Sequence, residues 1–472
     1  MMRNPLDRLD DALHGLADAR LKRWQRLALF SAACLFFCLA LQAIGFTHAA
    51  DVSQKWMICV LFMTLFALMM VPVFRRITQA KGSFVSYCLM IGVCASLLLL
   101  RIAMLEHQSA DYQAFLHAWV SQIRPLSFQQ AMLETDSNYT VIYRYIVFLI
   151  SRMPVSDLYI YKAVSIAFDI LLAYAVMRLY EMSEPQRGYI KALAFYFLTL
   201  SLPTVIINGA LWAQCDAIYA SLALMGIYYA LSNYPYRSSI CFALSLSFKI
   251  QAIFILPILF VLWGTRRIRV KHLFAFLLTI LMVCIPAIIC GRSLMDCFSI
   301  YTKQIGEYNQ LTLNAPSIYQ LLNQAVASRW IFSNVGIIFA VGATIFLTAV
   351  FLRQEKTINN TLFIDLAFLL CLMIPYLLPH MHERYFYLAD ALSVAYFACH
   401  SRRVYAPVLM VFCSLNSYLA FLQEKAFIPQ PMASLLLLML LCGTTVLLAK
   451  DLRMRRSASE SPASLMKGEV NA

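Results

Sequence analysis

The chain has 472 residues, of which 61% are hydrophobic and only 13% are charged, and its mean hydropathy is +0.71. This composition excludes a soluble globular protein, because it leaves too little polar surface to cover so large an apolar core. The net charge of +14 does not indicate a nucleic-acid partner, since most of the basic residues flank apolar runs, as the positive-inside bias of membrane proteins predicts.

Apolar runs long enough to cross a bilayer recur along the whole chain and predict an all-α protein, a polytopic transmembrane bundle of about 14 spans. The run 139–151 is left out, because it is short for a span and carries Arg144 in its middle, a charge that is costly in hydrocarbon. We expect an interfacial helix there, in the first large external loop. The predicted spans are residues 27–47, 55–74, 84–105, 158–180, 189–207, 217–232, 237–249, 251–264, 272–290, 331–352, 361–379, 386–400, 404–421 and 431–449.

Basic residues set the expected orientation of the bundle. With 139–151 not counted as a span, the basic run 266–271 faces the cytoplasm, and both termini lie on the same side. No convincing cleavage site follows the first apolar run, which predicts a retained helix rather than a signal peptide. The segment after residue 450 is rich in Ser, Ala and Glu, so we expect a disordered cytoplasmic tail.

Unusual polar residues gather on the expected non-cytoplasmic side. They occupy a long first loop with Asp111, a polar knot at 212–216, a short turn at 249–251 and a cluster at 380–384. Each lies where one apolar run ends and the next begins. We therefore expect them to converge in one water-accessible pocket.

Two of these places suit a reaction on a hydroxylated substrate. A carboxylate at Asp111 suits a general base for an acceptor hydroxyl or a ligand of a divalent ion, and the alternative is a helix cap or a solvated loop acid. Trp212, Gln214 and Asp216 combine an indole face, an amide and a carboxylate, which suits a sugar and its hydroxyl groups. The alternative there is an aromatic-belt residue followed by the N-cap of the next helix.

Ionisable residues also lie deep among apolar ones. Lys249, with Gln251 beside it, lies at a turn between two helices that are short for spans. An ionisable group at membrane depth indicates a functional site, and the alternative is a side chain that extends to the interface. Lys162 and Asp169 lie two helical turns apart on one face of a predicted span, so they are candidates for a mutual pair.

The densest polar cluster is His380-Met381-His382-Glu383-Arg384. Two histidines and a glutamate suit a metal, but their spacing differs from the His-Glu-x-x-His of zinc proteases, which disfavours zinc. Arg384 suits an anionic phosphate through charge-assisted hydrogen bonds, and His382 suits a leaving phosphate.

Read together and in order, these motifs resemble bacterial membrane mannosyltransferase-like proteins related to the eukaryotic GPI mannosyltransferase II, within the glycosyltransferase C superfamily. The resemblance runs from about residue 101 to about residue 397. The matching residues are Ser109-x-Asp111-Tyr112, Asn138-Tyr139, Lys162…Asp169, Asn208-Gly209…Trp212-x-Gln214-Cys215-Asp216-Ala217-Ile218-Tyr219, Phe248-Lys249-x-Gln251-Ala252-Ile253-Phe254…Pro257, Asn314-x-Pro316 and Pro379-His380-Met381-His382-Glu383-Arg384-Tyr385.

The resemblance implies a fold of the glycosyltransferase C type, a polyprenyl-phosphate sugar donor and inversion at the anomeric carbon. It implies Asp111 as the base. The implied donor-phosphate contacts are Lys249, His382 and Arg384, and the implied sugar or acceptor contacts are Tyr112, Trp212, Gln214, Asp216, Gln251, His380 and Glu383. The chain departs from the family pattern at Ala213, where the family has Gly, and at Thr140, where it has Pro.

The expected organisation follows from this resemblance. Residues 1–83 form a cytoplasmic segment and two extra helices, 84–403 the glycosyltransferase C-like membrane core, 404–449 two C-terminal helices and 450–472 the tail. We expect a bacterial inner-membrane protein with its active site in the periplasm. The expected partners are membrane lipid, the lipid-linked donor of mannose or another hexose, and a glycolipid, polysaccharide or protein acceptor, with a requirement for Mg or Mn left open.

Two other functions fit many spans with buried charges. A transporter or a flippase for lipid-linked sugars is the main alternative, although the sequence shows no paired repeats or matching broken helices in two halves. A polysaccharide polymerase or ligase is a further alternative. It would be expected to carry its large external loop later in the chain.

Overall fold

A computed structural model describes residues 20–134, 140–183, 188–303, 309–322, 329–354 and 358–459. The motif residues Asn138 and Tyr139 lie outside the described residues, as do most of the N-terminal cytoplasmic segment and the end of the predicted tail. The described chain is mostly helical, with very little strand.

Nine helices of the described residues are long and apolar enough to cross a membrane, so the chain is a polytopic all-α membrane protein. A tenth crossing arises if α9 (Tyr189–Leu200) and the helix that follows it, which are bent by 52° at a short break, form one span. The nine helices are α2 (Arg23–Gln42), α3 (Val52–Gln79), α4 (Phe84–Ile102), α8 (Asp157–Ser183), α14 (Val270–Ile289), α16 (Arg329–Leu352), α17 (Asn360–Leu377), α19 (Tyr405–Leu422) and α20 (Gln430–Ser459).

The other predicted spans coincide with helices that are shorter than a typical crossing. These are α11 (Asp216–Leu231), α12 (Pro235–Phe248), α13 (Ile258–Gly264) and α18 (Tyr387–Cys399). Within the described residues, helix length therefore supports nine or ten crossings, and the count of about 14 stays a prediction. The tail prediction needs a correction at its start, because α20 continues as a helix to Ser459, past residue 450.

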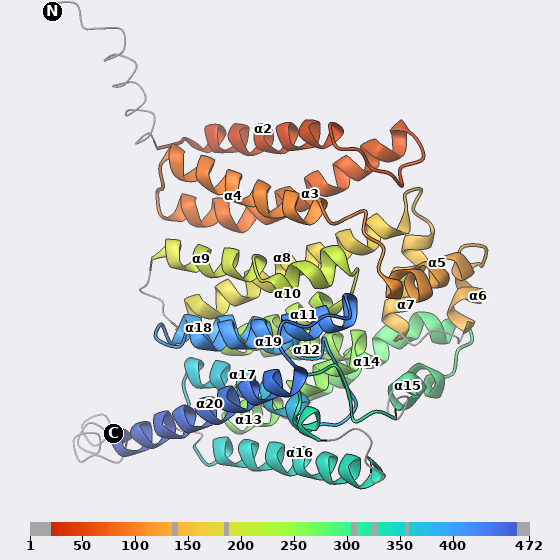
Figure 1. The fold of residues 1–472 in the computed structure, drawn as a ribbon. Coiled ribbons are helices and arrows are strands. Elements are labelled where there is room, and N and C mark those ends of the chain that lie inside the picture. Colours follow the sequence, from red (N-terminus) through yellow and green to blue (C-terminus); the bar gives the residue numbers. More distant parts are fainter. Residues whose placement is uncertain are drawn as a thin grey trace, which may run out of the picture.

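The helices lie side by side in layers (Figure 1). In that view α2, α3 and α4 form the top layer, α8 and α9 lie below them, and α16 lies at the bottom. The first turn of α2 and the last turns of α20 lie at the same, left end of the bundle. The short helices α5, α6, α7 and α15 lie at the right end, which we call the loop end. They are His117–Ile123, Phe128–Leu133, Val141–Ser151 and Leu294–Lys303.

Burial separates central helices from peripheral ones. In α17, 83% of the most apolar window is buried inside the protein, whereas in α16 the share is 11%. A helix that is apolar all round must be surrounded by other helices or by lipid. Helix α17 is therefore central, packed against α18, α20 and α16, and α16 presents its apolar side chains outward.

Irregular backbone interrupts the helices next to the polar motifs. Two short π-helices, η1 (Tyr112–Leu116) and η2 (Ile207–Leu211), follow α4 and α10 (Pro203–Ile206), and a 3-10 turn, η3 (Ile250–Phe254), follows α12. Strand β1 (Thr312–Leu313) pairs in parallel with β2 (Met381–His382). This pairing ties the 380–384 cluster to the loop before α16.

Candidate functional site

The Asp111 carboxylate is held by two donors from the 212–216 knot. Trp212 Nε1 and Gln214 Nε2 each donate to Asp111 Oδ2 at 2.9 Å. The Ser109 hydroxyl accepts from the Tyr112 amide at 3.1 Å and donates to the Trp212 carbonyl at 3.0 Å. Ser109 and Asp111 therefore join the first loop to the knot, as the sequence predicted. The expected water-accessible pocket around them stays a prediction.

The knot itself is a tight backbone reversal after η2. The Trp212 amide donates to the Ile207 carbonyl at 2.9 Å, and the Gln214 amide donates to the Asn208 carbonyl at 2.8 Å. Between them, Ala213 has a φ of +63°. An L-residue with a side chain is strained by about 1–2 kcal/mol in this left-handed region. Glycine would relieve the backbone at this position, which is one of the two where the sequence departs from the family that it resembles.

A buried ion pair forms the second part of the site. Asp216, the first residue of α11, is fully buried. Its Oδ1 accepts from Lys249 Nζ at 2.5 Å, and its Oδ2 accepts from Asn208 Nδ2 at 3.0 Å. The Lys249 side chain is only 9% exposed, so it pairs inside the protein instead of extending to the membrane interface.

Arg384 links these two parts. Its Nη1 lies 2.9 Å from Glu383 Oε1 and 3.8 Å from Asp111 Oδ2, and its Nε lies 3.8 Å from Asp216 Oδ2. Three carboxylates thus face two cations, Arg384 and Lys249, which leaves one net negative charge when all five groups are ionised. We call Asp111, Asp216, Lys249, Glu383 and Arg384 the ionic cluster.

Glu383 is fixed in its charged form by its neighbours. Its Oε2 lies 3.6 Å from His382 Nδ1, and the residue is 1% exposed. Burial by itself raises the pKa of Glu383, but the neighbouring His382 ring and the charge of Arg384 outweigh it, so the pKa lies below its ordinary value of 4.5. The 380–384 segment therefore brings a carboxylate, Glu383, as well as a cation, Arg384, to the cluster.

Trp212 is a support for the cluster and not an open platform. Its indole is fully buried, with the Arg384 guanidinium 5.4 Å from the ring centroid and Phe421 stacked at 5.1 Å. Tyr418 packs on it edge-on at 5.4 Å. The predicted sugar contact through the indole face has no exposed surface in this structure, because α19 covers it.

Helix α19 was not expected at the site. The sequence division placed it outside the core, beyond residue 403, yet Phe421 and Tyr418 both contact Trp212, and Asn208 Nδ2 lies 3.5 Å from the Tyr418 hydroxyl. No polar motif lies next to these two aromatic residues in the sequence. The one signal for them was their position near the end of a predicted span, on the side where the polar motifs were expected.

Two other predicted contacts lie apart from the ionic cluster. The Tyr112 side chain is buried and hydrogen-bonds with Asp157, and burial, reinforced by that carboxylate, raises its pKa. The His380 ring bonds to the Ser333 hydroxyl at 2.9 Å and to the Gln310 carbonyl at 2.7 Å, at a backbone φ of +63°. Both residues hold loops together in this structure.

Several buried amide oxygens near the cluster lack a hydrogen-bond partner in the described protein. They are Gln214 Oε1, Asn208 Oδ1 and Gln251 Oε1. Burial raises the pKa of Tyr385 to about 12, so its phenol stays neutral and hydrogen-bonds with the Gln251 side chain. A buried acceptor without a donor is costly, so each oxygen can accept from a hydroxyl group or from water.

The expected pair between Lys162 and Asp169 needs a correction. Lys162 Nζ donates instead to three backbone carbonyls after α4, and Asp169 Oδ2 accepts from Arg101 Nε at 3.3 Å. Seven residues of helix separate the two side chains along its axis by about 10 Å, so each meets a different neighbouring segment.

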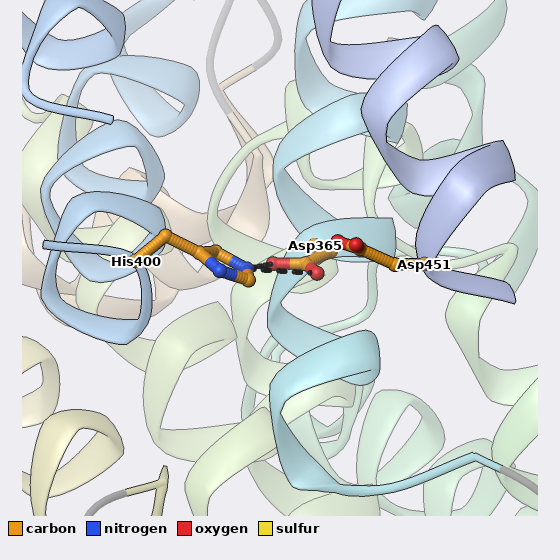
Figure 2. A group of neighbouring side chains, drawn as sticks. All are labelled: Asp365, His400 and Asp451. Atoms are coloured by element: carbon orange, nitrogen blue, oxygen red, sulfur yellow. Dashed lines mark hydrogen bonds and ion pairs between the residues drawn. The ribbon is translucent and has the colours of Figure 1, made fainter. Parts of the chain in front are cut away.

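One group of three potential metal ligands converges in the described part of the chain, away from the ionic cluster. Figure 2 shows His400 pointing at Asp365, with Asp451 of α20 on the other side. His400 Nε2 lies 2.9 and 3.1 Å from the two Asp365 oxygens, and Arg403 Nη2 donates to Asp451 at 2.8 Å. Each carboxylate of this group therefore already has a basic partner within the protein. We call Asp365, His400, Arg403 and Asp451 the ionic clasp.

The fold and the ionic cluster thus define a polytopic helical membrane protein with a buried, highly charged site near one end of its bundle. No protein-family model matches the chain, and no curated protein matches it in sequence.

Proposed function

We propose that the protein is a membrane glycosyltransferase that moves a sugar, mannose or another hexose, from a polyprenyl-phosphate donor to an acceptor hydroxyl. The observation that carries the proposal is convergence. Asp111, Asp216 and Arg384 come from three distant segments, yet the guanidinium lies 3.8 Å from each carboxylate. A base, two cations and hydrogen-bond acceptors in one buried site are the groups that this transfer requires.

Each group has a role in the proposed reaction. Asp111 takes the proton from the acceptor hydroxyl as its oxygen bonds to the anomeric carbon. The bond between that carbon and the donor phosphate oxygen breaks on the opposite face, so the configuration inverts. The electron pair leaves on the lipid phosphate, which departs as an anion and needs no general acid.

The cations of the cluster are suited to the phosphate. Arg384 and Lys249 approach different carboxylate oxygens of Asp216, so the two cations lie on either side of it. His382, next to Glu383, is the third proposed phosphate contact. The unpartnered oxygens of Gln214 and Gln251 suit donation from sugar hydroxyls. We assign Tyr112, Trp212 and His380 to supporting this arrangement, and Asp216 and Glu383 to orienting the cations.

We place the protein in the bacterial inner membrane with the site in the periplasm. Basic segments orient both termini toward the cytoplasm. The first turn of α2 and the last turns of α20 lie at the end of the bundle opposite the loop end (Figure 1). That arrangement supports termini and site on opposite sides of the membrane.

The test is product analysis with membranes that contain or lack the protein. A panel of polyprenyl-phosphate sugars is supplied with Mg, with Mn and with a chelator. We expect a glycosylated product only with the protein, and a loss of about 10²–10⁴-fold in Asp111→Asn. Asp296→Asn, at an exposed acid of α15, is the matched control and should retain full activity. Transfer at the wild-type rate by Asp111→Asn would remove the base assignment.

A transporter or flippase for lipid-linked sugars is the second candidate. The bend of 52° between α9 and the helix that leads to the knot favours it, since broken helices beside buried charges are common in transporters. Sealed vesicles without an acceptor separate the two functions. Movement of a labelled lipid-linked sugar across such vesicles would favour the flippase.

A further inference from the structure

One face of α8 carries polar side chains that are buried and lie outside the ionic cluster. Lys162, Ser165 and Asp169 follow each other at intervals of three and four residues, so they share one helix face. All three are at most 2% exposed. Polar groups are costly at such depth unless each has a partner, and the partners of these three form a pattern.

Lys162 holds the chain that leads to Asp111. Its Nζ donates to the carbonyls of Met104, Leu105 and His107 at 2.8, 2.9 and 2.6 Å. An ammonium group has three N–H donors, so all of them are used on one turn. That turn closes α4 and precedes Ser109 and Asp111 directly. Its position is therefore set by a side chain of α8.

Ser165, one helical turn further on, holds the knot, which contacts Asp111 from the other side. Its hydroxyl donates to the Gln214 carbonyl at 2.6 Å, and the Gln214 side chain is a donor to Asp111. The backbone of η2 rests on this face as well. A Cβ added at Gly209 would lie 3.2 Å from Ser165 Cβ and 3.4 Å from Asp169 Oδ2.

Asp169 reaches the third segment of the site. Its Oδ1 accepts from the Tyr387 hydroxyl at 3.4 Å, while its Oδ2 pairs with Arg101. The Tyr387 amide in turn donates to the Arg384 carbonyl at 3.1 Å. The same helix face thus contacts the first loop, the knot and the segment that carries Arg384.

We propose that this face of α8 is a positioning platform, and that Lys162 and Ser165 are positioning residues that set where Asp111 lies relative to Gln214. They touch no reacting atom. Their effect on catalysis rests on the proposed function, in which Asp111 is the base. A base displaced by about 1 Å loses about 10²-fold in rate even when the substrate still binds. Their effect on the geometry of the site does not depend on that function.

The sharpest test uses two serines that make the same kind of bond. Ser238 of α12 is also buried, and its hydroxyl donates to the Gly226 carbonyl at 2.8 Å. It lies at the other end of α12 from Lys249, so it has no part in the site. Ser165→Ala and Ser238→Ala should lose similar stability, which a thermal melt measures. Only Ser165→Ala should lower kcat, by about tenfold, with KM within about twofold of the wild type.

Lys162→Met is the stronger variant, with an expected fall in kcat of about 10²-fold at similar KM. Lys162→Gln restores one amide donor and should recover part of that loss. Hydrogen exchange supplies a readout without any substrate. In Ser165→Ala and Lys162→Met we expect faster exchange of the amides at 108–116 and 212–216, with α16 and α20 unchanged. Ser238→Ala should leave both segments protected.

The outcomes separate the two proposals. If the wild type transfers sugar and both platform variants keep its kcat, the positioning role is wrong. Unchanged exchange at both segments would overturn it as well. If exchange rises locally in both variants while the wild type transfers no sugar to any acceptor, the platform stands and the proposed function falls.

Discussion

The ionic cluster and the ionic clasp both combine carboxylates with basic side chains, but they differ in how closely each carboxylate is paired. In the clasp, Asp365 faces His400 at 2.9 Å, and Asp451 accepts from Arg403 at 2.8 Å. In the cluster, Arg384 has one contact at 2.9 Å and two at 3.8 Å. Only the clasp places every carboxylate in a short contact with a basic partner.

This difference shows why converging charges alone do not identify a functional site. The clasp joins α17, the end of α18 and α20, and each of its bonds is explained by that role. The cluster has long contacts, buried amide oxygens without a partner and a left-handed Ala213 beside it. Strain and unmet hydrogen bonds persist where the surrounding structure fixes them, and they are concentrated at functional sites.

The largest expected effect follows from breaking the cluster at Lys249. In Lys249→Met the Asp216 carboxylate keeps its full burial but loses its closest cation, so unfolding free energy should fall by about 3–5 kcal/mol. The double variant Lys249→Met/Asp216→Asn should recover much of this loss without recovering sugar transfer. Thermal unfolding in detergent measures the first effect. A single variant as stable as the wild type would contradict the buried pair.

Breaking the clasp should cost less and spare the reaction. In His400→Leu the buried Asp365 carboxylate loses its hydrogen-bond partner, at a cost of about 1–3 kcal/mol. His400→Gln offers an amide donor and should cost less than His400→Leu. Both variants should transfer sugar at the wild-type rate per folded molecule. A rate that falls with either one, at full folding, would show that the clasp acts on the site.

Lowering the pH should weaken the ionic cluster through Glu383. Its pKa is lowered in the folded protein, so its carboxylate stabilises the fold above the ordinary value of 4.5, and this contribution disappears as pH falls through the folded-state pKa. Glu383→Gln lacks that contribution at every pH. Melting curves of the wild type and the variant should therefore differ at neutral pH and converge in acid. A constant difference would argue against the lowered pKa.

The smallest expected effect is a gain. Ala213→Gly removes the penalty of a left-handed φ of +63°, and part of that gain is offset by the extra freedom of glycine in the unfolded chain. We expect stability to rise by about 0.5–1 kcal/mol, measured as a higher melting temperature. A fall in stability would indicate that the Ala213 methyl contributes packing that outweighs the strain.

The sequence was sufficient for the parts of the molecule that follow from hydrophobicity and charge. Apolar runs predicted a polytopic helical membrane protein, and the exclusion of 139–151 agrees with the short helix α7 found there. The gathering of Asp111, Trp212, Gln214, Asp216 and Arg384 was expected from their shared position at the ends of apolar runs.

Other features depend on tertiary contacts that no local pattern encodes. Phe421 and Tyr418 are ordinary aromatic residues of a late helix until they are seen against Trp212. Lys162 and Asp169 were correctly placed on one helix face, but their partners are backbone carbonyls and an arginine from another helix. The role of His380 in tying loops together also depends on Ser333 and Gln310, which lie far away in sequence.

Helix α20 has 30 residues, which makes it about 45 Å long, against a hydrocarbon thickness of about 30 Å. Because of this excess length, we expect its last turns, beyond the Arg403–Asp451 contact, to project past the lipid as a rod, at the end of the bundle where α2 begins (Figure 1). A fluorescent reporter or an affinity resin joined to that rod would be held clear of the bilayer. The protein could then be immobilised by this handle with its opposite, loop-bearing surface free for substrate.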